Sequence, residues 1–303
     1  MNITIKVPAT SANLGPGFDS LGLALDLWNE TTITLAIEFS VQIYGEGAEK
    51  LSQGKNNLII RSAQKLAERV GKHLPPFHVH CVNHIPPSSG LGSSAAATLT
   101  GLLGATALLG NPFLNDDILN LGAELEGHSD NVAPALLGGL VVSTMGADAG
   151  KIMAHKIGEV GHAVPLHITI ALPDFQLPTK QARAALPEQV TVKDAVYNIS
   201  RAVMVAEALR SGDLDLLGEA MTDRLHQPHR LPLIPGAQAA MDAAKQAGAS
   251  AVALSGAGPS LIAFSKAESA IGEAMQCAFE ERGLSARIFH VNVSSHGAET
   301  QIH

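Results

Sequence analysis

Apolar and polar residues alternate along several short stretches of the chain, the pattern typical of half-buried β-strands. The predicted strands cover residues 3–7, 31–37, 39–44, 77–85, 139–145, 151–156, 166–172, 251–254, 261–264 and 286–293. Apolar residues spaced three and four apart predict helices instead. These helices cover residues 58–70, 95–109, 115–126, 181–186, 192–209, 214–224, 237–247 and 268–282. Residues 8–19 are rich in Gly, Ser, Asn and Pro and are predicted to form a long loop after the first strand.

The longest predicted helix, 192–209, has apolar residues at helical spacing along its whole length. They are Val192, Val196, Ile199, Val203, Ala206 and Leu209. This spacing marks one face of the helix.

The order of these elements predicts an α+β fold. The second half contains two helices and then strand, turn, strand, helix and strand, which indicates an α+β sandwich. A chain of 303 residues is long for a single core and suggests two domains. The Gly-rich run 146–161 is the predicted boundary, with an N-terminal domain of residues 1–160 and a C-terminal domain of residues 161–303.

Composition narrows the class of protein. Apolar residues make up 46% and charged residues 16%, which favours a well-packed core over disorder. The net charge of −8 with dispersed basic residues argues against nucleic-acid binding. We expect no membrane association, because no apolar run reaches spanning length and the N-terminus does not resemble a signal peptide. Cys81 and Cys277 are far apart and in no CxxC pair, so a reducing cytoplasm is the simplest compartment.

A Gly/Ser-rich segment joins a predicted strand to a predicted helix and is the most informative stretch of the chain. Its sequence is Pro86-Pro87-Ser88-Ser89-Gly90-Leu91-Gly92-Ser93-Ser94-Ala95-Ala96. A helix N-terminus offers unpaired N–H donors and partial positive charge, which favours an anion such as phosphate. The segment matches neither the P-loop nor the dinucleotide-binding fingerprint. A plain turn between strand and helix is the alternative interpretation.

Two other segments carry candidate chemistry. The loop 255–260 contains Gly256 and Gly258 and offers a second small-residue surface for a triphosphate. The run 126–131 holds a carboxylate, Glu126, which together with the Ser94 hydroxyl provides the oxygen ligands that a divalent ion bridging phosphates needs. Taken alone, the loop 255–260 is better explained as a bare β-turn, and the run 126–131 is equally consistent with a solvated helix end. Arg183 and Arg230 suit bidentate binding of a carboxylate, although each one taken individually is better explained as a surface arginine.

Taken together, segments 8–19, 86–96 and 255–260 resemble the three motifs of the galactokinase, homoserine kinase, mevalonate kinase and phosphomevalonate kinase (GHMP) superfamily. Within it, residues 8–19, 126–134 and 230–236 resemble the homoserine kinase family. The resemblance implies a ribosomal protein S5 domain 2-like N-terminal domain and a ferredoxin-like C-terminal domain. It also implies transfer of a phosphoryl group from ATP, with Mg²⁺, to the hydroxyl of L-homoserine, giving O-phospho-L-homoserine for threonine biosynthesis.

The resemblance also assigns roles to residues. ATP would lie on Pro86–Ala96, Gly256 and Gly258, and Mg²⁺ would bind Ser94 and Glu126, with Glu124 as the alternative carboxylate. The substrate site would be lined by Asn13, Asp19, His128, Asn131, Thr179, Arg183 and Arg230. In it, Arg183 and Arg230 would hold the substrate carboxylate and Asp19 the ammonium group, and Asn13 and Asn131 would be catalytic.

Asn131 stands where mevalonate kinase-like relatives have an aspartate base, and an amide cannot accept a proton at neutral pH. The hypothesis is therefore phosphoryl transfer without a dedicated protein base, achieved by positioning and charge neutralisation. Asp130 is not assigned as the base, because adjacent residues rarely point the same way. Two alternatives stay open: a kinase of another small alcohol, and a non-catalytic nucleotide-binding metabolite sensor. The oligomeric state also stays open, with a homodimer as one option.

Overall fold

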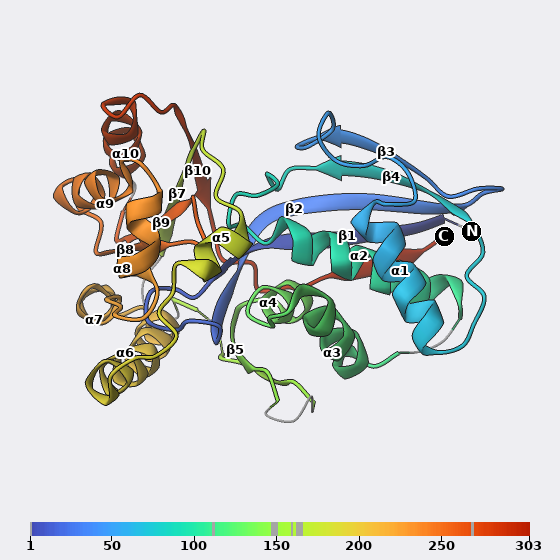
Figure 1. Ribbon diagram of the computed structural model, residues 1–303, viewed down its shortest axis with the longest axis horizontal. Coiled ribbons are helices and arrows are strands. Elements are labelled where there is room, and N and C mark those ends of the chain that lie inside the picture. Colours follow the sequence, from blue (N-terminus) through green and yellow to red (C-terminus); the bar gives the residue numbers. More distant parts are fainter. Residues whose placement is uncertain (1, 111–112, 147–150, 159, 162–165, 268–269) are drawn as a thin grey trace.

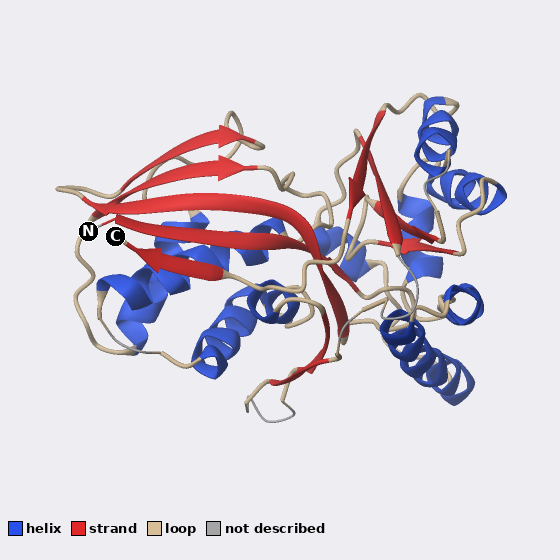
Figure 2. Cartoon of the chain, turned by 180° about the vertical axis from the view of Figure 1, so that it is seen from behind, coloured by secondary structure: helices blue, strands red, loops and turns tan. Residues whose placement is uncertain are grey.

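The computed structural model describes residues 2–110, 113–146, 151–158, 160–161, 166–267 and 270–303 (Figure 1). Two β-sheets, each with helices packed against it, form the molecule (Figure 2). Among the described residues, no helix combines the length and the apolar character that crossing a bilayer requires.

The larger sheet contains most of the N-terminal half of the chain. Its strands are β1 (Asn2–Ala12), β2 (Leu21–Leu35), β3 (Ser40–Gly45), β4 (Phe77–Asn83), β5 (Leu140–Thr144), β6 (Met153–Lys156) and β11 (Glu299–Ile302). The order is β11-β1-β2-β4-β3, with β5 added to β2 and β6 to β5. One face is covered by α1 (Leu58–Arg69), α2 (Ser93–Leu108), α3 (Asn115–Glu126) and α4 (Val132–Leu137), as Figure 1 shows. The last strand of the chain, β11, thus returns to pair with the first.

The smaller sheet is antiparallel and has the order β10-β7-β9-β8. Its strands are β7 (His167–Pro173), β8 (Ala251–Leu254), β9 (Leu261–Ser265) and β10 (Ala286–Val291). The helices of this half are α5 (Thr179–Ala184), α6 (Val192–Ser211), α7 (Leu214–Ala220), α8 (Gln227–Arg230), α9 (Ala237–Gln246) and α10 (Ile271–Glu280), with a 3₁₀ turn at Leu231–Leu233.

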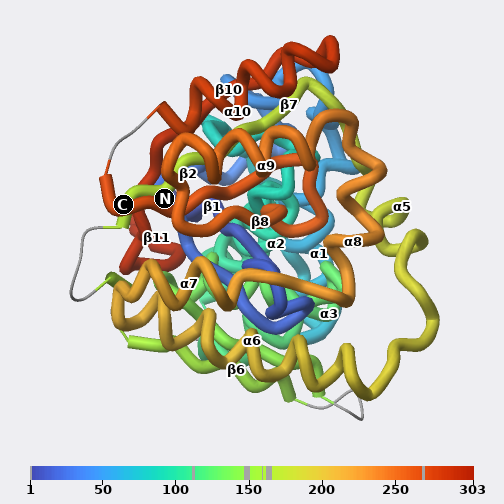
Figure 3. Tube along the Cα trace, turned by 90° about the vertical axis from the view of Figure 1, so that its left-hand side faces the viewer, coloured from blue at the N-terminus to red at the C-terminus, as the bar shows by residue number. Residues whose placement is uncertain are grey.

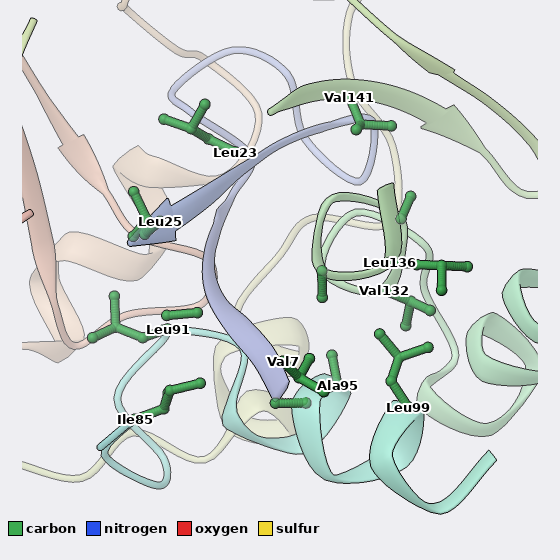
Figure 4. Packing of buried hydrophobic residues seen from close by; sticks show 14 of the residues in the cluster. Val7, Leu23, Leu25, Ile85, Leu91, Ala95, Leu99, Val132, Leu136 and Val141 are labelled. Atoms are coloured by element: carbon green, nitrogen blue, oxygen red, sulfur yellow. The ribbon is translucent and has the colours of Figure 1, made fainter. Parts of the chain in front are cut away.

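A continuous apolar core joins β1, β2 and the first helices. Figure 4 shows Val7 of β1 beside Ala95 at the start of α2. Leu23 and Leu25 of β2 and Leu99 of α2 belong to the same core. Small residues predominate in α2, and most of the helix is buried. The core therefore fixes the start of α2 against β1, and this is where the Gly/Ser segment lies.

Several predicted boundaries were wrong. β1 continues to Ala12, although residues 8–19 were predicted to be a loop. The register between β1 and β2 shifts between Pro8 and Ala9, and such an irregularity lets a strand pass a proline that cannot donate a ladder hydrogen bond. β2 likewise begins at Leu21, ten residues before the predicted strand. The helix α4 and the strand β11 were not predicted, because both are too short to show a period.

Helix α6 has nearly the predicted bounds, yet its predicted apolar face is mostly exposed. Of that face only Leu209 is buried; the helix packs on the molecule through Asn198, Val205, Ala208 and Leu209. Parts of the Gly-rich run 146–161 and the predicted helix start at 268–269 lie outside the described residues. The division of the chain at 160/161 stays a prediction.

Candidate active site

Backbone hydrogen bonds join the three segments that carry the motifs. Thr10 N on β1 donates to Leu91 O at 3.1 Å, and Gly256 N donates to Ala12 O at 3.0 Å. The Ser255 hydroxyl donates to Gly90 O at 2.8 Å. The end of β1, the Gly/Ser segment and the β8–β9 loop therefore form one surface, although they are far apart in the sequence.

Glycine is required at two points of this contact. Gly90 has φ +83°, and a Cβ there would lie 2.3 Å from Ser255 O on the facing loop. Gly92 has φ +73°, and its Cβ would lie 2.0 Å from the Thr10 hydroxyl. A side chain at either position would both strain the backbone and separate the segments.

A cavity of about 430 Å³ opens at this junction. All of the predicted substrate residues line it: Asn13, Asp19, His128, Asn131, Thr179, Arg183 and Arg230. So do the predicted nucleotide residues Pro87, Ser88, Ser89, Gly90, Gly92, Ser93, Ser94, Gly256 and Gly258. The other predicted nucleotide residues, Pro86, Leu91, Ala95 and Ala96, are buried behind this lining.

The start of α2 faces the cavity with free donors. Gly92 caps the helix in a left-handed conformation, and in the described chain no side chain caps the first turn. The first N–H groups of a helix have no partner within the helix, so here they are left to bind an anion. Ser93 and Ser94 in the same turn add hydroxyls at the cavity wall.

Glu126, at the end of α3, lies beside this helix start. It accepts hydrogen bonds of 2.6 Å from the hydroxyls of Ser94 and Thr98. Glu124, the alternative, instead pairs with Arg69 on the outer surface. Hard oxygen donors such as Ser94 and Glu126 suit Mg²⁺, which usually takes one or two protein carboxylates and completes its shell with phosphates and water. The described residues contain no cluster of three or more His, Cys, Asp or Glu that could hold a metal alone.

Asp19, in the loop after β1, and Arg183, on α5, form an ion pair at the cavity wall. Arg183 donates two hydrogen bonds of 2.9 Å to the Asp19 carboxylate, and this pairing raises the pKa of Arg183. Thr179 and Arg183 are four residues apart on α5, so they share the helix face that lines the cavity. Asn13 holds the loop in shape: its Oδ1 accepts from Asp19 N at 2.9 Å, and its Nδ2 donates to Gly256 O at 2.8 Å.

Arg230 is almost fully buried, and its hydrogen-bond partners among the described residues are neutral groups at long distances. Its guanidinium donates to Ala182 O, Gly256 O and the His226 ring at 3.3–3.4 Å. Burial, and then the charge of Arg183, lower the pKa of Arg230. The Phe18 ring lies 5.1 Å from the Arg230 guanidinium and stacks on His226 at 5.2 Å. A buried cation with weak partners at a cavity wall is suited to receive an anionic ligand.

The segment after Glu126 brings two further polar groups to the cavity. His128 Nδ1 lies 3.0 Å from Asp130 Oδ1, a contact that is an ion pair when the histidine is protonated. Burial lowers the pKa of His128, but the Asp130 and Glu126 carboxylates outweigh it and raise the pKa overall. Asn131 Oδ1 accepts a 2.8 Å hydrogen bond from Thr10. Asp130 lines the same cavity as Asn131, and the interpretation that Asp130 is not the base stays a prediction.

Sequence reasoning missed one wall of the cavity. This wall is made by Asn29, Thr31, Ile43, Leu51, Ser52, Asn56, Asn57, Leu58, Ile59, Cys81 and Asn83. Most come from strands β2 to β4 and the segment before α1, where their alternation indicates only a strand. No local motif marks them; the one available signal was the polar pair before α1, whose Asn57 caps that helix.

Comparison with known proteins identifies the family. The family models described as GHMP kinases N terminal domain and GHMP kinases C terminal match residues 57–139 and 205–281. A homoserine kinase from Moorella thermoacetica is 43% identical over 296 residues, covering 97% of this chain and 98% of the relative. The crystal structure of a homoserine kinase from Cytophaga hutchinsonii has a TM-score of 0.85 at 32% identity, covering 99% of this chain and 97% of that one.

A more distant solved structure shares the fold at 16% identity, with a TM-score of 0.66 and coverage of 100% of this chain and 99% of that one. It is described as a complex with MVAPP, AMPPCP and magnesium. The predicted resemblance and the two-domain GHMP kinase fold are confirmed. The chain belongs to the homoserine kinase family of the GHMP kinases.

Proposed function

We propose that this chain transfers the γ-phosphoryl group of ATP to the hydroxyl of L-homoserine, producing O-phospho-L-homoserine and ADP for threonine biosynthesis. The observation that carries the proposal is the make-up of the cavity at the start of α2. Its donor-rich helix start suits a triphosphate, and it also holds two arginines and an aspartate that suit a zwitterionic amino acid. Two relatives of this chain, at 43% and 32% identity, are described as homoserine kinases.

The nucleotide would lie on the Gly/Ser segment and the facing loop. Residues 86–96 would wrap the triphosphate, with Gly256 and Gly258 on the other side. Ser94 and Glu126 would hold Mg²⁺, which would neutralise phosphate charge when bound. Glu126 is favoured over Glu124 because it already contacts Ser94. We assign the reaction to the cytoplasm, in line with two cysteines that are both free.

The charged groups of the amino acid would bind the two members of the Asp19–Arg183 ion pair. The substrate ammonium would join Asp19, and its carboxylate would join Arg183 and Arg230. Each charged group of the site then keeps an opposite charge beside it, which limits the cost of desolvating the site. Thr179 and His128 would line the same pocket. Asn13 would act by holding Asp19 and the 256 loop, and would keep one N–H for the substrate.

The chemical step would rely on orientation. The bond from the homoserine oxygen to the γ-phosphorus forms as the bond from that phosphorus to the bridging β-oxygen breaks. The hydroxyl proton is released to a phosphate oxygen or to water, because Asn131 cannot accept it. Thr10 occupies the Asn131 carbonyl oxygen, which leaves the amide N–H groups to orient the acceptor oxygen. A loose transition state makes such positioning and charge neutralisation sufficient.

The decisive experiment measures ADP release with Mg²⁺ and a panel of acceptors: L-homoserine, L-serine, L-threonine and mevalonate. We expect turnover to be fastest with L-homoserine. Mevalonate has no ammonium group to neutralise Asp19 and should be poor. A preference for mevalonate or another alcohol would favour the first alternative. ADP release with none of the acceptors, despite ATP binding, would favour a metabolite sensor.

A further inference from the structure

Helices α2 and α3 lie side by side on one face of the larger sheet (Figures 1 and 3). Glu126 is the last residue of α3, and each oxygen of its carboxylate accepts one hydroxyl from the first turns of α2. Oε2 accepts from Ser94 and Oε1 accepts from Thr98, both at 2.6 Å. The two hydroxyls are four residues apart on α2, so they lie on the same face of the helix and share one carboxylate.

The hydroxyl of Thr98 differs from those of the other two threonines of α2. A threonine hydroxyl within a helix can donate to the carbonyl four residues earlier in the same helix. Thr100 does so, donating to Ala96 O at 2.8 Å. Thr106 likewise donates to Leu102 O at 2.9 Å. Thr98 instead donates to a side chain 28 positions along the chain, so its hydroxyl links two helices.

Burial separates the roles of the two hydroxyls that bind Glu126. Ser94 is exposed and lines the cavity. Thr98 is 0% exposed, so no ligand in the cavity can touch its hydroxyl. A hydroxyl has a single proton, and in Thr98 the Glu126 carboxylate accepts it. Thr98 can therefore influence a ligand only through Glu126.

We propose that Thr98 is a positioning residue for the metal site: it holds Oε1 of Glu126, so that Oε2 is the oxygen presented to Mg²⁺. This inference rests on the proposed function, which takes Ser94 and Glu126 as the Mg²⁺ ligands. The exposed Ser94 hydroxyl can turn its proton away and offer a lone pair, whereas the buried Thr98 hydroxyl keeps its bond. Removing a group that orients a metal ligand typically weakens metal binding by a factor of about 10 to 100.

The hydrogen bond from Thr98 also favours Mg²⁺ over Ca²⁺. Mg²⁺ demands near-ideal octahedral geometry, whereas Ca²⁺ tolerates irregular geometry and binds carboxylates through one oxygen or both. With Oε1 held, the Glu126 carboxylate cannot rotate freely or offer both oxygens to one ion. Loss of the Thr98 hydroxyl should therefore weaken Mg²⁺ binding more than Ca²⁺ binding, a difference that a purely structural role of Thr98 would not produce.

Calorimetry of the full chain with a non-hydrolysable ATP analogue tests this role without relying on turnover. Kd for the analogue is measured in Mg²⁺, in Ca²⁺ and in EDTA. Thr98→Val keeps the shape of the side chain but removes the hydroxyl, so Kd in Mg²⁺ should rise roughly tenfold. Kd in Ca²⁺ should rise less than about threefold, because Ca²⁺ tolerates a mobile carboxylate. Kd in EDTA should stay unchanged.

Two further variants of α2 serve as controls. Thr98→Ser retains the hydroxyl and should bind the analogue in Mg²⁺ as the wild type does. Thr106→Val makes the same chemical change on the same helix, but it removes only a bond to the helix's own backbone, so all three Kd values should match the wild type. Urea unfolding verifies that each variant is folded. Thr98→Ala, which is smaller, should give the same two shifts as Thr98→Val and replaces it if the valine variant does not fold.

The outcomes separate this inference from the proposed function. An unchanged Kd in Mg²⁺ for Thr98→Val, together with a raised Kd for Glu126→Gln, would overturn the role of Thr98 and leave the metal site in place. An unchanged Kd in Mg²⁺ for Glu126→Gln would remove the metal site itself from the proposed function, and the role of Thr98 with it. Equal rises in Mg²⁺, Ca²⁺ and EDTA, or a weakened Thr98→Ser, would show that Thr98 acts through packing alone and would also refute the inference.

Discussion

The guanidinium of Arg183 and the carboxylate of Asp19 meet in two parallel hydrogen bonds of 2.9 Å, although 164 positions separate them in the chain. The pair joins the loop after β1 to helix α5 at the cavity wall. Under the proposed function, it holds both charged groups in place until the amino acid enters.

Arg183→Lys should raise KM for L-homoserine roughly 30-fold, about 2 kcal/mol, because an ammonium group cannot bind a carboxylate in bidentate fashion. The KM for ATP should change little. Arg287→Lys is the matched control, since Arg287 also makes a double hydrogen bond to a carboxylate, Glu46, but on the surface. If KM for L-homoserine stays unchanged in Arg183→Lys, the assignment of Arg183 to the substrate carboxylate is wrong.

The sequence allowed prediction of the parts of this site that are local. The strand, Gly/Ser loop and helix around Gly90 and Gly92 form one continuous segment, and the chemistry of its donors follows from that order. The Asp19–Arg183 contact depends on two distant segments meeting, which no local pattern reveals. The resemblance supplied both residues, and only the structure shows that they bind each other.

The spacing of apolar residues predicted which segments form helices and strands, but it did not predict what packs against them. The spacing along α6 identified the helix, but it could not tell which face is buried, and of the marked apolar residues only Leu209 is buried. The cavity wall from β2 to β4 escaped prediction for the same reason. Asn29 and Cys81 read as ordinary strand positions until the sheet brings them beside the Gly/Ser segment.

Asn131→Ala should lower kcat about 100-fold, roughly 2.7 kcal/mol, with a smaller change in KM, because the acceptor hydroxyl loses its orienting group. Thr10→Val removes the hydroxyl that holds Asn131 Oδ1 and should produce a weaker effect of the same kind. Steady-state rates over a range of pH check both variants. Unchanged turnover in Asn131→Ala would refute the orienting role.

Asp130→Asn separates orientation from general-base catalysis, since Asp130 is a buried carboxylate at the same cavity. We expect activity to fall moderately while the shape of the pH–rate profile is kept, because the loss affects only the charge beside His128. Loss of the acidic limb of the profile together with most of the turnover would instead identify Asp130 as a base.

Glu126→Gln should raise the Mg²⁺ concentration required for half-maximal activity at least tenfold, about 1.4 kcal/mol, because an amide is a weaker ligand than a carboxylate. Activity titrated with Mg²⁺ at fixed ATP provides the measurement. Glu124→Gln is a close control, because Glu124 lies two residues earlier on α3 but pairs with Arg69 on the surface. An equal shift in both variants, or a shift in Glu124→Gln alone, would remove Glu126 from the metal site.

His226 should make the protein less stable in mild acid. Its ring is buried; Nε2 lies 2.7 Å from Gly15 O and therefore donates, whereas Nδ1 faces the Arg230 guanidinium and accepts. Burial, and then the charge of Arg230, lower the pKa of His226, although Asp223 opposes them. The folded state therefore favours the neutral ring, because a proton on Nδ1 would point at the Arg230 guanidinium.

The sign follows from the two pKa values of His226. The folded value lies below the unfolded value of 6.5, so the unfolded chain binds the extra proton first as the pH falls. The stabilisation is fully present above pH 6.5 and is lost as the pH falls through the folded pKa, at a slope of at most about 1.4 kcal/mol per pH unit.

Urea unfolding at a series of pH values should show this loss in the wild type. His226→Gln should be less stable at pH above 6.5 yet lack this component of the slope, whereas His73→Gln, at an exposed histidine, should follow the wild type. Parallel curves for His226→Gln and the wild type would exclude His226 as the source of the acid sensitivity.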